Sequence, residues 1–181
     1  MFKNKIAKEN KEKQNIQLIQ DIVDHGTDEK GRNGNTRVII GSTMYFSYLN
    51  NKIPLLTTKK VAWKTCLKEL LWFIKGQTNN KILKEQKCYI WNGNASKQFL
   101  ESRSLKYEED DLGPVYGHQW RHFNAPYTTC NEDYSGKGVD QLEYIINSLK
   151  DPEKRSSRRL VMSAWNPCQL DEMALPPCHI L

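Results

Sequence analysis

The sequence predicts a layered α+β domain. Hydrophobic residues make up 38% of the 181 residues, which is enough for one ordinary domain with a sizeable core. Stretches with helical periodicity and stretches rich in β-branched and aromatic residues both occur in the chain. They follow no regular strand–helix alternation and no internal repeat, so a parallel βαβ architecture is not expected.

Apolar residues recur at helical spacing in several stretches. Gly26 and Gly76 are expected to end the first two helices, because glycine is the usual residue just after a helix. Thr78 is expected to cap a third, shorter helix. The predicted helices cover residues 16–25, 61–75, 78–87 and 142–149.

Two stretches have the composition of β-strands. Residues 38–49 are rich in β-branched and aromatic side chains, with Gly41 as an expected bulge, and predict a long strand. Residues 159–165 predict a buried strand. The remaining segments predict loops, at residues 32–36 and 50–60, and at 92–137 with short helices inside it.

The first 15 residues are basic and are expected to form a flexible extension before a single-domain portion of residues 16–181. Residues 1–16 hold five lysines and two glutamates, and so supply +3 of the net charge of +6. Such a segment can bind a nucleic acid or a membrane surface. It lacks arginines and interleaved aromatics, which favours a solvated extension, with RNA binding as the alternative.

Cys178 has the sequence surroundings of a positioned nucleophile. Pro176 and Pro177 precede it and restrict the backbone that enters it, and His179 follows it. A thiolate in such a setting can attack an electrophile. The alternative is a buried structural cysteine behind a proline turn.

Glu69 is the second candidate for chemistry. Its neighbours at helical spacing are mostly apolar, so loss of solvent should raise the pKa of its carboxyl and suit it to general acid–base work. The alternative is an exposed glutamate paired with a lysine. The adjacent Arg158 and Arg159 would point to opposite faces of a strand and could bind phosphate, or could form a plain surface charge pair.

Residues 173–179, Met-Ala-Leu-Pro-Pro-Cys-His, resemble the active-site segment of thymidylate synthase. Four further segments resemble that family in the same order along the chain, and the matches span about residues 32–181. The chain is therefore identified as a member of the thymidylate synthase family, which implies a layered fold with helices on a mixed β-sheet. The four segments are residues 54–60, 69–73, 111–121 and 158–167.

The resemblance implies reductive methylation of dUMP to dTMP, with 5,10-methylenetetrahydrofolate as carbon donor and reductant and with no metal. Cys178 would be the nucleophile, Glu69 would organise proton transfers through water, and Tyr116 and His179 would assist beside the nucleophile. Phosphate would be bound by Arg32, and by Arg158 and Arg159 across a homodimer interface. The loop that contains Arg32 carries fewer glycines and threonines than is usual in the family.

The same resemblance implies a folate site. Trp91 would pack against the folate, with Asn92 beside it, where the family usually has an aspartate. Lys59 and Lys60 would attract the acidic folate tail, with a solvated loop as the alternative.

Chains of this family continue past the catalytic cysteine, so we expect an N-terminal portion, incomplete at its C-terminus and inactive as it stands. Two other functions remain open: a deoxycytidylate hydroxymethylase, and a non-catalytic remnant that binds RNA or an intact synthase subunit. The five cysteines form no CxxC pair, which predicts reduced thiols and a cytoplasmic location. No apolar run is long enough for a membrane span.

Overall fold

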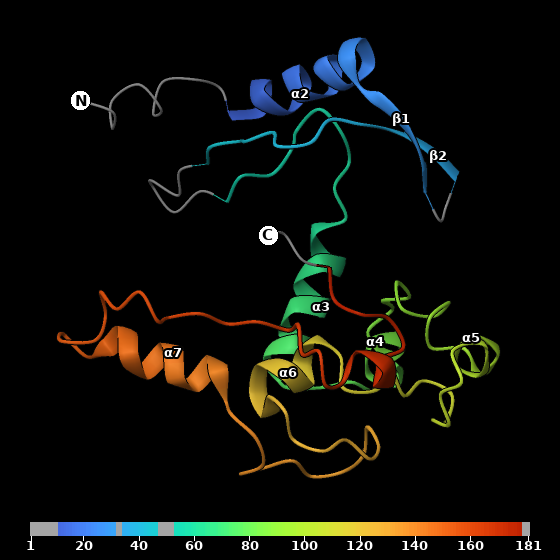
Figure 1. Cartoon of the computed structure of the whole chain (residues 1–181), viewed down its shortest axis with the longest axis vertical. Helices are drawn as coiled ribbons and strands as arrows, with labels where there is room; N and C mark the ends of the chain where they lie inside the picture. Colours follow the sequence, from blue (N-terminus) through green and yellow to red (C-terminus); the bar gives the residue numbers. More distant parts are fainter. Residues whose placement is uncertain (1–10, 32–33, 47–52, 179–181) are drawn as a thin grey trace. The chain divides into compact units, whose positions relative to one another are not determined.

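A computed structural model describes residues 11–31, 34–46 and 53–178. The chain divides into two compact units, Met1–Ala62 and Trp63–Leu181, here called the N-terminal unit and the C-terminal unit. Figure 1 shows the elements of the first in blue to cyan and those of the second in green to red.

The N-terminal unit holds one helix and one hairpin. Helix α2 (Lys11–His25) ends at Gly26, whose N–H donates to the carbonyl of Ile22. A Cβ at Gly26 would collide with that same carbonyl, so the close turn requires glycine. The predicted helix over residues 16–25 is confirmed, and it begins earlier, at Lys11. The hairpin pairs β1 (Thr27–Gly31) with β2 (Gly34–Val38) in antiparallel register.

Two predictions about this hairpin region are wrong. The segment predicted as a loop, residues 32–36, contains the start of β2 at Gly34. The long strand predicted over residues 38–49 is absent from residues 39–46, and residues 47–49 lie outside the described residues. The reason is that β-propensity reports a side chain's fit to a pleated surface, whereas a strand needs a neighbour. Pairing with β1 stops at Val38, opposite Thr27.

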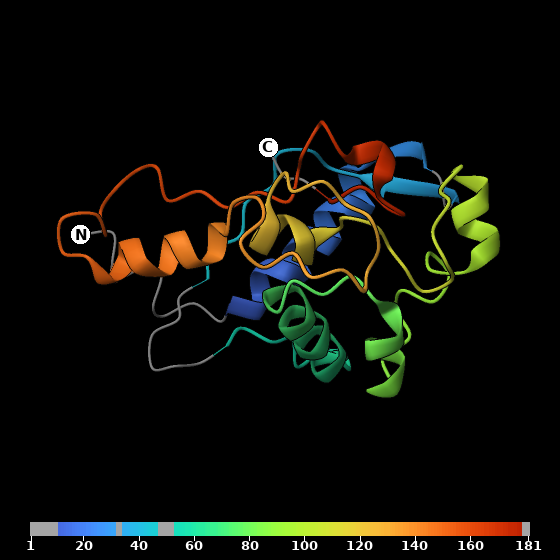
Figure 2. The ribbon, with the colours of Figure 1, turned by 90° about the horizontal axis from the view of Figure 1, so that it is seen from below.

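The C-terminal unit is built from short helices around one core. The helix predicted over residues 61–75 is confirmed as α3, and that over 142–149 is confirmed as α7. Helix α6 contacts both α3 and α7, while α7 and α5 lie at opposite ends of the unit (Figures 1 and 2). The helices are α3 (Trp63–Ile74), α4 (Asn80–Glu85), α5 (Lys97–Ser102), α6 (Tyr116–His122), α7 (Gln141–Lys150) and the 3-10 turn η2 (Leu170–Glu172).

The cap of α4 differs from the prediction. Asn79, not Thr78, caps the helix by accepting a hydrogen bond from the N–H of Lys81 at 3.0 Å. The hydroxyl of Thr78 lies 2.8 Å from the hydroxyl of Tyr127, with which it forms a hydrogen bond. Tertiary contact therefore displaced the cap by one residue.

The core of the C-terminal unit joins segments that are distant in the sequence. Helix α3 contributes Trp72 and Phe73, and the segment after η2 contributes Met173, which is fully buried. Burying one such side chain stabilises a fold by about 1.5–3 kcal/mol. The fully buried members of the cluster also include Leu83, Leu100, Leu112, Val115 and Ala174.

The strand predicted over residues 159–165 is also absent. Val161 is exposed, and no neighbouring strand pairs with this segment among the described residues. Instead, the side-chain amide of Gln141 donates to the carbonyl of Ser163 at 2.8 Å and accepts from its N–H at 3.0 Å. The side chain of Gln141 thus forms the two backbone hydrogen bonds that a neighbouring strand would otherwise form with Ser163. The described residues combine helices with one small antiparallel sheet, as expected of an α+β fold.

Candidate active site

The carboxyl of Glu69 lies on α3 and is half-buried. The indole N–H of Trp91 donates to its Oε1 at 2.7 Å. Loss of solvent raises the pKa of Glu69, and the hydrogen bond from Trp91 opposes that rise because it stabilises the carboxylate. The prediction that this carboxyl has a raised pKa is confirmed.

An aromatic cluster that includes Trp91 links α3 to α6. Phe73 packs on Tyr116 with ring centroids 4.8 Å apart and on Trp120 at 5.5 Å. Trp91 meets Tyr116 edge to face at 6.3 Å. Packed rings leave few rotamers, so they hold the indole N–H and the phenol hydroxyl in place.

The segment that leads to Cys178 is anchored on the turn before α6. The N–H of Ala174 donates to the carbonyl of Leu112 at 3.0 Å. Gly113 has a φ of +73° and faces the carbonyl of Glu172 so closely that a Cβ would collide with it. Only glycine fits both conditions. The chain that enters the cysteine therefore lies against the turn that starts α6.

Tyr116 connects this anchored segment to the aromatic cluster. Its hydroxyl accepts a hydrogen bond from the backbone N–H of Cys178 at 2.8 Å. Pro176 and Pro177 have no N–H, so Cys178 offers the first amide donor after Leu175. Burial raises the pKa of Tyr116, and the nearby charges of Cys178 and Glu69 raise it further. The phenol is therefore neutral and lies close to both groups.

The arrangement has the parts needed for covalent catalysis. Cys178 is exposed and can reach a ligand, Glu69 can exchange a proton, and Tyr116 can donate or accept a hydrogen bond beside the thiol. This group of three residues is called the Cys178 cluster below.

The two adjacent arginines do not lie on a strand, which corrects the prediction. Arg158 and Arg159 are exposed in a turn. The N–H of Arg159 donates to the hydroxyl of Ser157 at 3.2 Å, and its carbonyl accepts from Val161 at 3.0 Å. These local bonds bend the backbone, so the alternation of faces expected from a strand does not apply here.

The remaining predicted site residues are dispersed. Lys59 and Lys60 are exposed in the N-terminal unit, and Asn92 is half-buried, where its side-chain oxygen accepts from the amide of Asn80 at 3.1 Å. Arg32 and His179 lie outside the described residues. The structure thus brings together Cys178, Tyr116, Glu69 and Trp91.

Sequence reasoning missed a buried amide network behind α6. The amide of Gln119 donates to the carbonyl of Pro114 at 2.9 Å and to the side chain of Gln169 at 3.0 Å. Asn166 donates to the same oxygen of Gln169 at 2.9 Å. This network ties α6 to the chain that leads to Cys178. Uncharged amides carry no chemical signal in a sequence, so the family resemblance of these segments was the one available hint.

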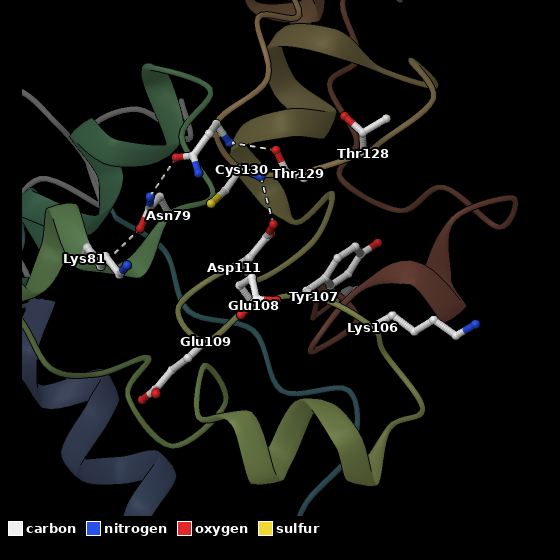
Figure 3. A pocket seen from close by; sticks show the side chains of 11 residues that line it. Asn79, Lys81, Lys106, Tyr107, Glu108, Glu109, Asp111, Thr128, Thr129 and Cys130 are labelled. Atoms are coloured by element: carbon white, nitrogen blue, oxygen red, sulfur yellow. Dashed lines mark hydrogen bonds between the residues drawn. The ribbon is translucent and has the colours of Figure 1, made fainter.

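A hollow of about 250 Å³ opens elsewhere in the C-terminal unit. Figure 3 shows Asp111, Cys130 and Tyr107 among the side chains that line it. Burial, followed by the charge of Asp111, raises the pKa of the Cys130 thiol to about 12. A thiol that stays protonated is a poor nucleophile, so this hollow does not rival the Cys178 cluster as an active site.

The described residues hold neither a candidate metal centre nor a candidate membrane span. They contain no group of three or more His, Cys, Asp or Glu side chains arranged to hold a metal ion. Within the same residues, no helix combines the length and the apolar character needed to cross a membrane.

A thiol, a phenol and a half-buried carboxyl in one region form a combination that enzymes use in covalent catalysis. A family model described as thymidylate synthase matches residues 13–181, and the chain belongs to this family, which is one of methyltransferases.

The alignments with similar proteins cover nearly the whole chain. A bifunctional dihydrofolate reductase-thymidylate synthase of Leishmania amazonensis is 46% identical over 178 residues, which are 97% of this chain and 34% of the relative. A putative protein of the same description from Oryza sativa subsp. japonica is 50% identical over 97% of this chain and 35% of its own length. A probable thymidylate synthase of Schizosaccharomyces pombe is 49% identical over 93% of this chain and 27% of its own. The chain spans about a third of the length of the curated relatives it matches.

Proposed function

We propose that this chain carries the nucleophile-bearing part of a thymidylate synthase that converts dUMP to dTMP with 5,10-methylenetetrahydrofolate. One observation carries the proposal. The hydrogen bond from Cys178 to Tyr116 holds the thiol beside the aromatic cluster that also holds Glu69. Membership in the thymidylate synthase family supports dUMP and 5,10-methylenetetrahydrofolate as the substrates, because that family acts on them.

The proposed reaction begins at the thiol. The Cys178 thiolate adds to C6 of the uracil ring, and the electron pair moves to C5. C5 then attacks the methylene carbon of the folate and forms a new carbon–carbon bond. A base removes the C5 proton, the ring expels the folate amine, and the exposed methylene accepts a hydride from the tetrahydrofolate. The thiolate leaves, giving dTMP and dihydrofolate, so the folate is oxidised as the carbon is reduced.

Glu69 and Tyr116 would handle protons in this sequence. Burial raises the pKa of the Glu69 carboxyl, which makes the carboxyl a better proton acceptor, so Glu69 can give and take protons through a water molecule. Tyr116 would hold the backbone of Cys178 and assist near C5, and His179 would support the surroundings of the thiol.

The remaining predicted roles belong to the same proposal. Arg32, Arg158 and Arg159 would bind the nucleotide phosphate, the last two across a homodimer interface. Trp91 and Asn92 would contact the folate, and Lys59 and Lys60 would attract its acidic tail. The proposal also includes a layered fold with a mixed sheet, a single domain over residues 16–181 and a cytoplasmic location. The five free thiols support the cytoplasmic location.

Tritium release from C5-tritiated dUMP tests the proposal. The assay uses the chain itself and a fusion that appends the part of the Schizosaccharomyces pombe relative that follows the matched region. We expect release by the fusion and none after Cys178→Ser. The matched control is Cys168→Ser, an exposed cysteine outside the Cys178 cluster, which should keep release within about twofold.

Two outcomes would contradict this proposal. Release that survives Cys178→Ser would overturn the nucleophile, and absence of release from both proteins would overturn the activity. A fusion that instead exchanges the C5 proton of dCMP in preference to dUMP would favour the hydroxymethylase alternative.

A further inference from the structure

Glu12 lies in the first turn of α2 and holds a loop more than 40 residues away. Its Oε1 accepts from the N–H groups of Thr57 and Thr58 at 2.6 and 2.7 Å, and from the Thr58 hydroxyl at 2.8 Å. Its Oε2 accepts from the Thr57 hydroxyl at 2.6 Å. Hydrogen bonds to a charged acceptor are the stronger kind, and four of them converge on one carboxylate.

The hydrogen bonds also keep this carboxylate ionised. The Thr57 hydroxyl, followed by the donors of Thr58, lowers the pKa of Glu12 to about 2. The Glu12 carboxylate is therefore charged at neutral pH, where it can accept all four hydrogen bonds.

The next turn of the helix makes a second attachment. The side-chain amide of Gln14 donates to the carbonyl of Tyr45 at 2.9 Å, and its oxygen accepts from the N–H of Tyr45 at 2.8 Å. The start of α2 thus attaches to the chain at Tyr45 and again at residues 57–58. Both attachments lie inside the N-terminal unit.

Lys59 and Lys60 directly follow the attached threonines. Both are exposed, and neither forms an ion pair with a described residue. Both carboxylate oxygens of Glu12 accept hydrogen bonds from the two threonines. Two lysines that form no such ion pair and lie on a restrained backbone are suited to bind an anion that carries more than one carboxylate.

We infer that Glu12 is a positioning residue that fixes residues 57–58 so that Lys59 and Lys60 present their charges to the carboxylates of an oligo-glutamyl folate tail. The identity of the anion rests on the proposed function. The attachment of the loop by Glu12 does not, and the two parts are tested separately.

Limited proteolysis tests the attachment in the full chain. Trypsin cuts after lysine only where the backbone can open locally, so cleavage at Lys59 and Lys60 reports how firmly the loop is held. We expect Glu12→Ala to speed this cleavage about tenfold, because four hydrogen bonds are lost. Glu12→Gln, which keeps the shape and can still bond both threonines, should rescue most of the protection.

The matched control is Glu29→Gln. Glu29 is an exposed glutamate on β1 whose side chain forms no hydrogen bond or ion pair with a described residue, so its cleavage should equal the wild type. Thr57→Val attacks the same contact from the loop and should give an intermediate rate. If trypsin cleaves Glu12→Ala no faster than Glu29→Gln, Glu12 does not attach the loop.

Folate affinity tests the anion. Wild type and Glu12→Ala, both as the fusion described above, are titrated with a monoglutamyl and a tetraglutamyl folate. Misplacing two lysines should weaken the tetraglutamyl form about fivefold and leave the monoglutamyl form nearly unchanged. Equal weakening of both would make Glu12 merely structural and overturn the inference. A wild type that does not prefer the tetraglutamyl form would overturn the choice of anion, while the proteolysis result still decides the attachment.

Discussion

The C-terminal unit contains two groups with the same three kinds of side chain and opposite character. The Cys178 cluster has a cysteine, Tyr116 and Glu69, whereas the second group has a cysteine, Tyr127 and Asp111. In the second, Asp111 is almost fully buried and accepts from the Tyr127 hydroxyl at 2.6 Å, the Cys130 N–H at 2.8 Å and the Gly113 N–H at 3.0 Å. The Asp111 carboxylate thus accepts its hydrogen bonds from groups within the protein.

The Cys178 cluster differs in what it leaves available. Glu69 is half-buried and accepts from Trp91, while the thiol of Cys178 is exposed. The pKa of Tyr127, like that of Cys130, is raised by burial and by the charge of Asp111. The comparison teaches that residue type does not make a site. A saturated buried carboxylate builds structure, and a half-buried one beside an exposed thiol can support chemistry.

Thiol reactivity should show the largest difference between the two groups. A thiol with a pKa of about 12 is ionised in only about one molecule in 10,000 at pH 8, so Cys130 should resist iodoacetamide. Cys178 should be modified within minutes. Peptide mass spectrometry separates the cysteines, with the buried Cys88 as the unreactive control. Equal labelling of Cys130 and Cys178 would end the distinction.

Removing the two carboxylates should affect stability unequally. Asp111→Ala leaves three donors without their acceptor in a buried place and should lower the free energy of unfolding by about 4 kcal/mol. Glu69→Ala removes one accepted hydrogen bond and should cost about 1 kcal/mol. Urea unfolding measures both, and similar costs would show that Glu69 is as structural as Asp111.

Acid should weaken the side of the unit that holds the second group. His118 is buried with its ring edge to face with Tyr127, and burial lowers its pKa from 6.5 to about 4. The unfolded chain takes up this proton first. Stability is therefore complete above pH 6.5 and falls as the pH drops toward 4, by about 3 kcal/mol in all.

Unfolding in urea at pH 4.5 and pH 7.5 measures this loss. The loss should shrink in His118→Gln and persist in His122→Gln, since His122 is the less buried neighbour. An unchanged loss in His118→Gln would assign the acid sensitivity to another group.

The smallest effect should come from Trp91→Phe. The indole N–H stabilises the Glu69 carboxylate, so its removal should raise the pKa of Glu69 further. Carbon-13 NMR titration of the glutamate carboxyls measures the shift. Trp120→Phe is the control, because this ring belongs to the same aromatic cluster and the bond to Glu69 remains. A shift in the control equal to that in Trp91→Phe would attribute the effect to packing.

Local pattern was enough for the helices and not for the strands. The apolar spacing in α2, α3 and α7 is a property of consecutive residues, and those predictions are confirmed. The predicted strands at 38–49 and 159–165 needed neighbours that no local pattern supplies. Tertiary contacts also moved the cap of α4 to Asn79, since the hydroxyl of Thr78 bonds to Tyr127.

The sequence by itself determined the family, through five ordered segments, and it indicated Cys178 and Glu69 as the residues for chemistry. It could not show that Cys130 lies beside a buried carboxylate, nor that Glu12 holds Thr57 and Thr58. Those distinctions depend on exposure and on hydrogen bonds between residues tens of positions apart. Only the folded chain brings such groups together, and burial then decides which of them stay ionised, protonated or within reach of a ligand.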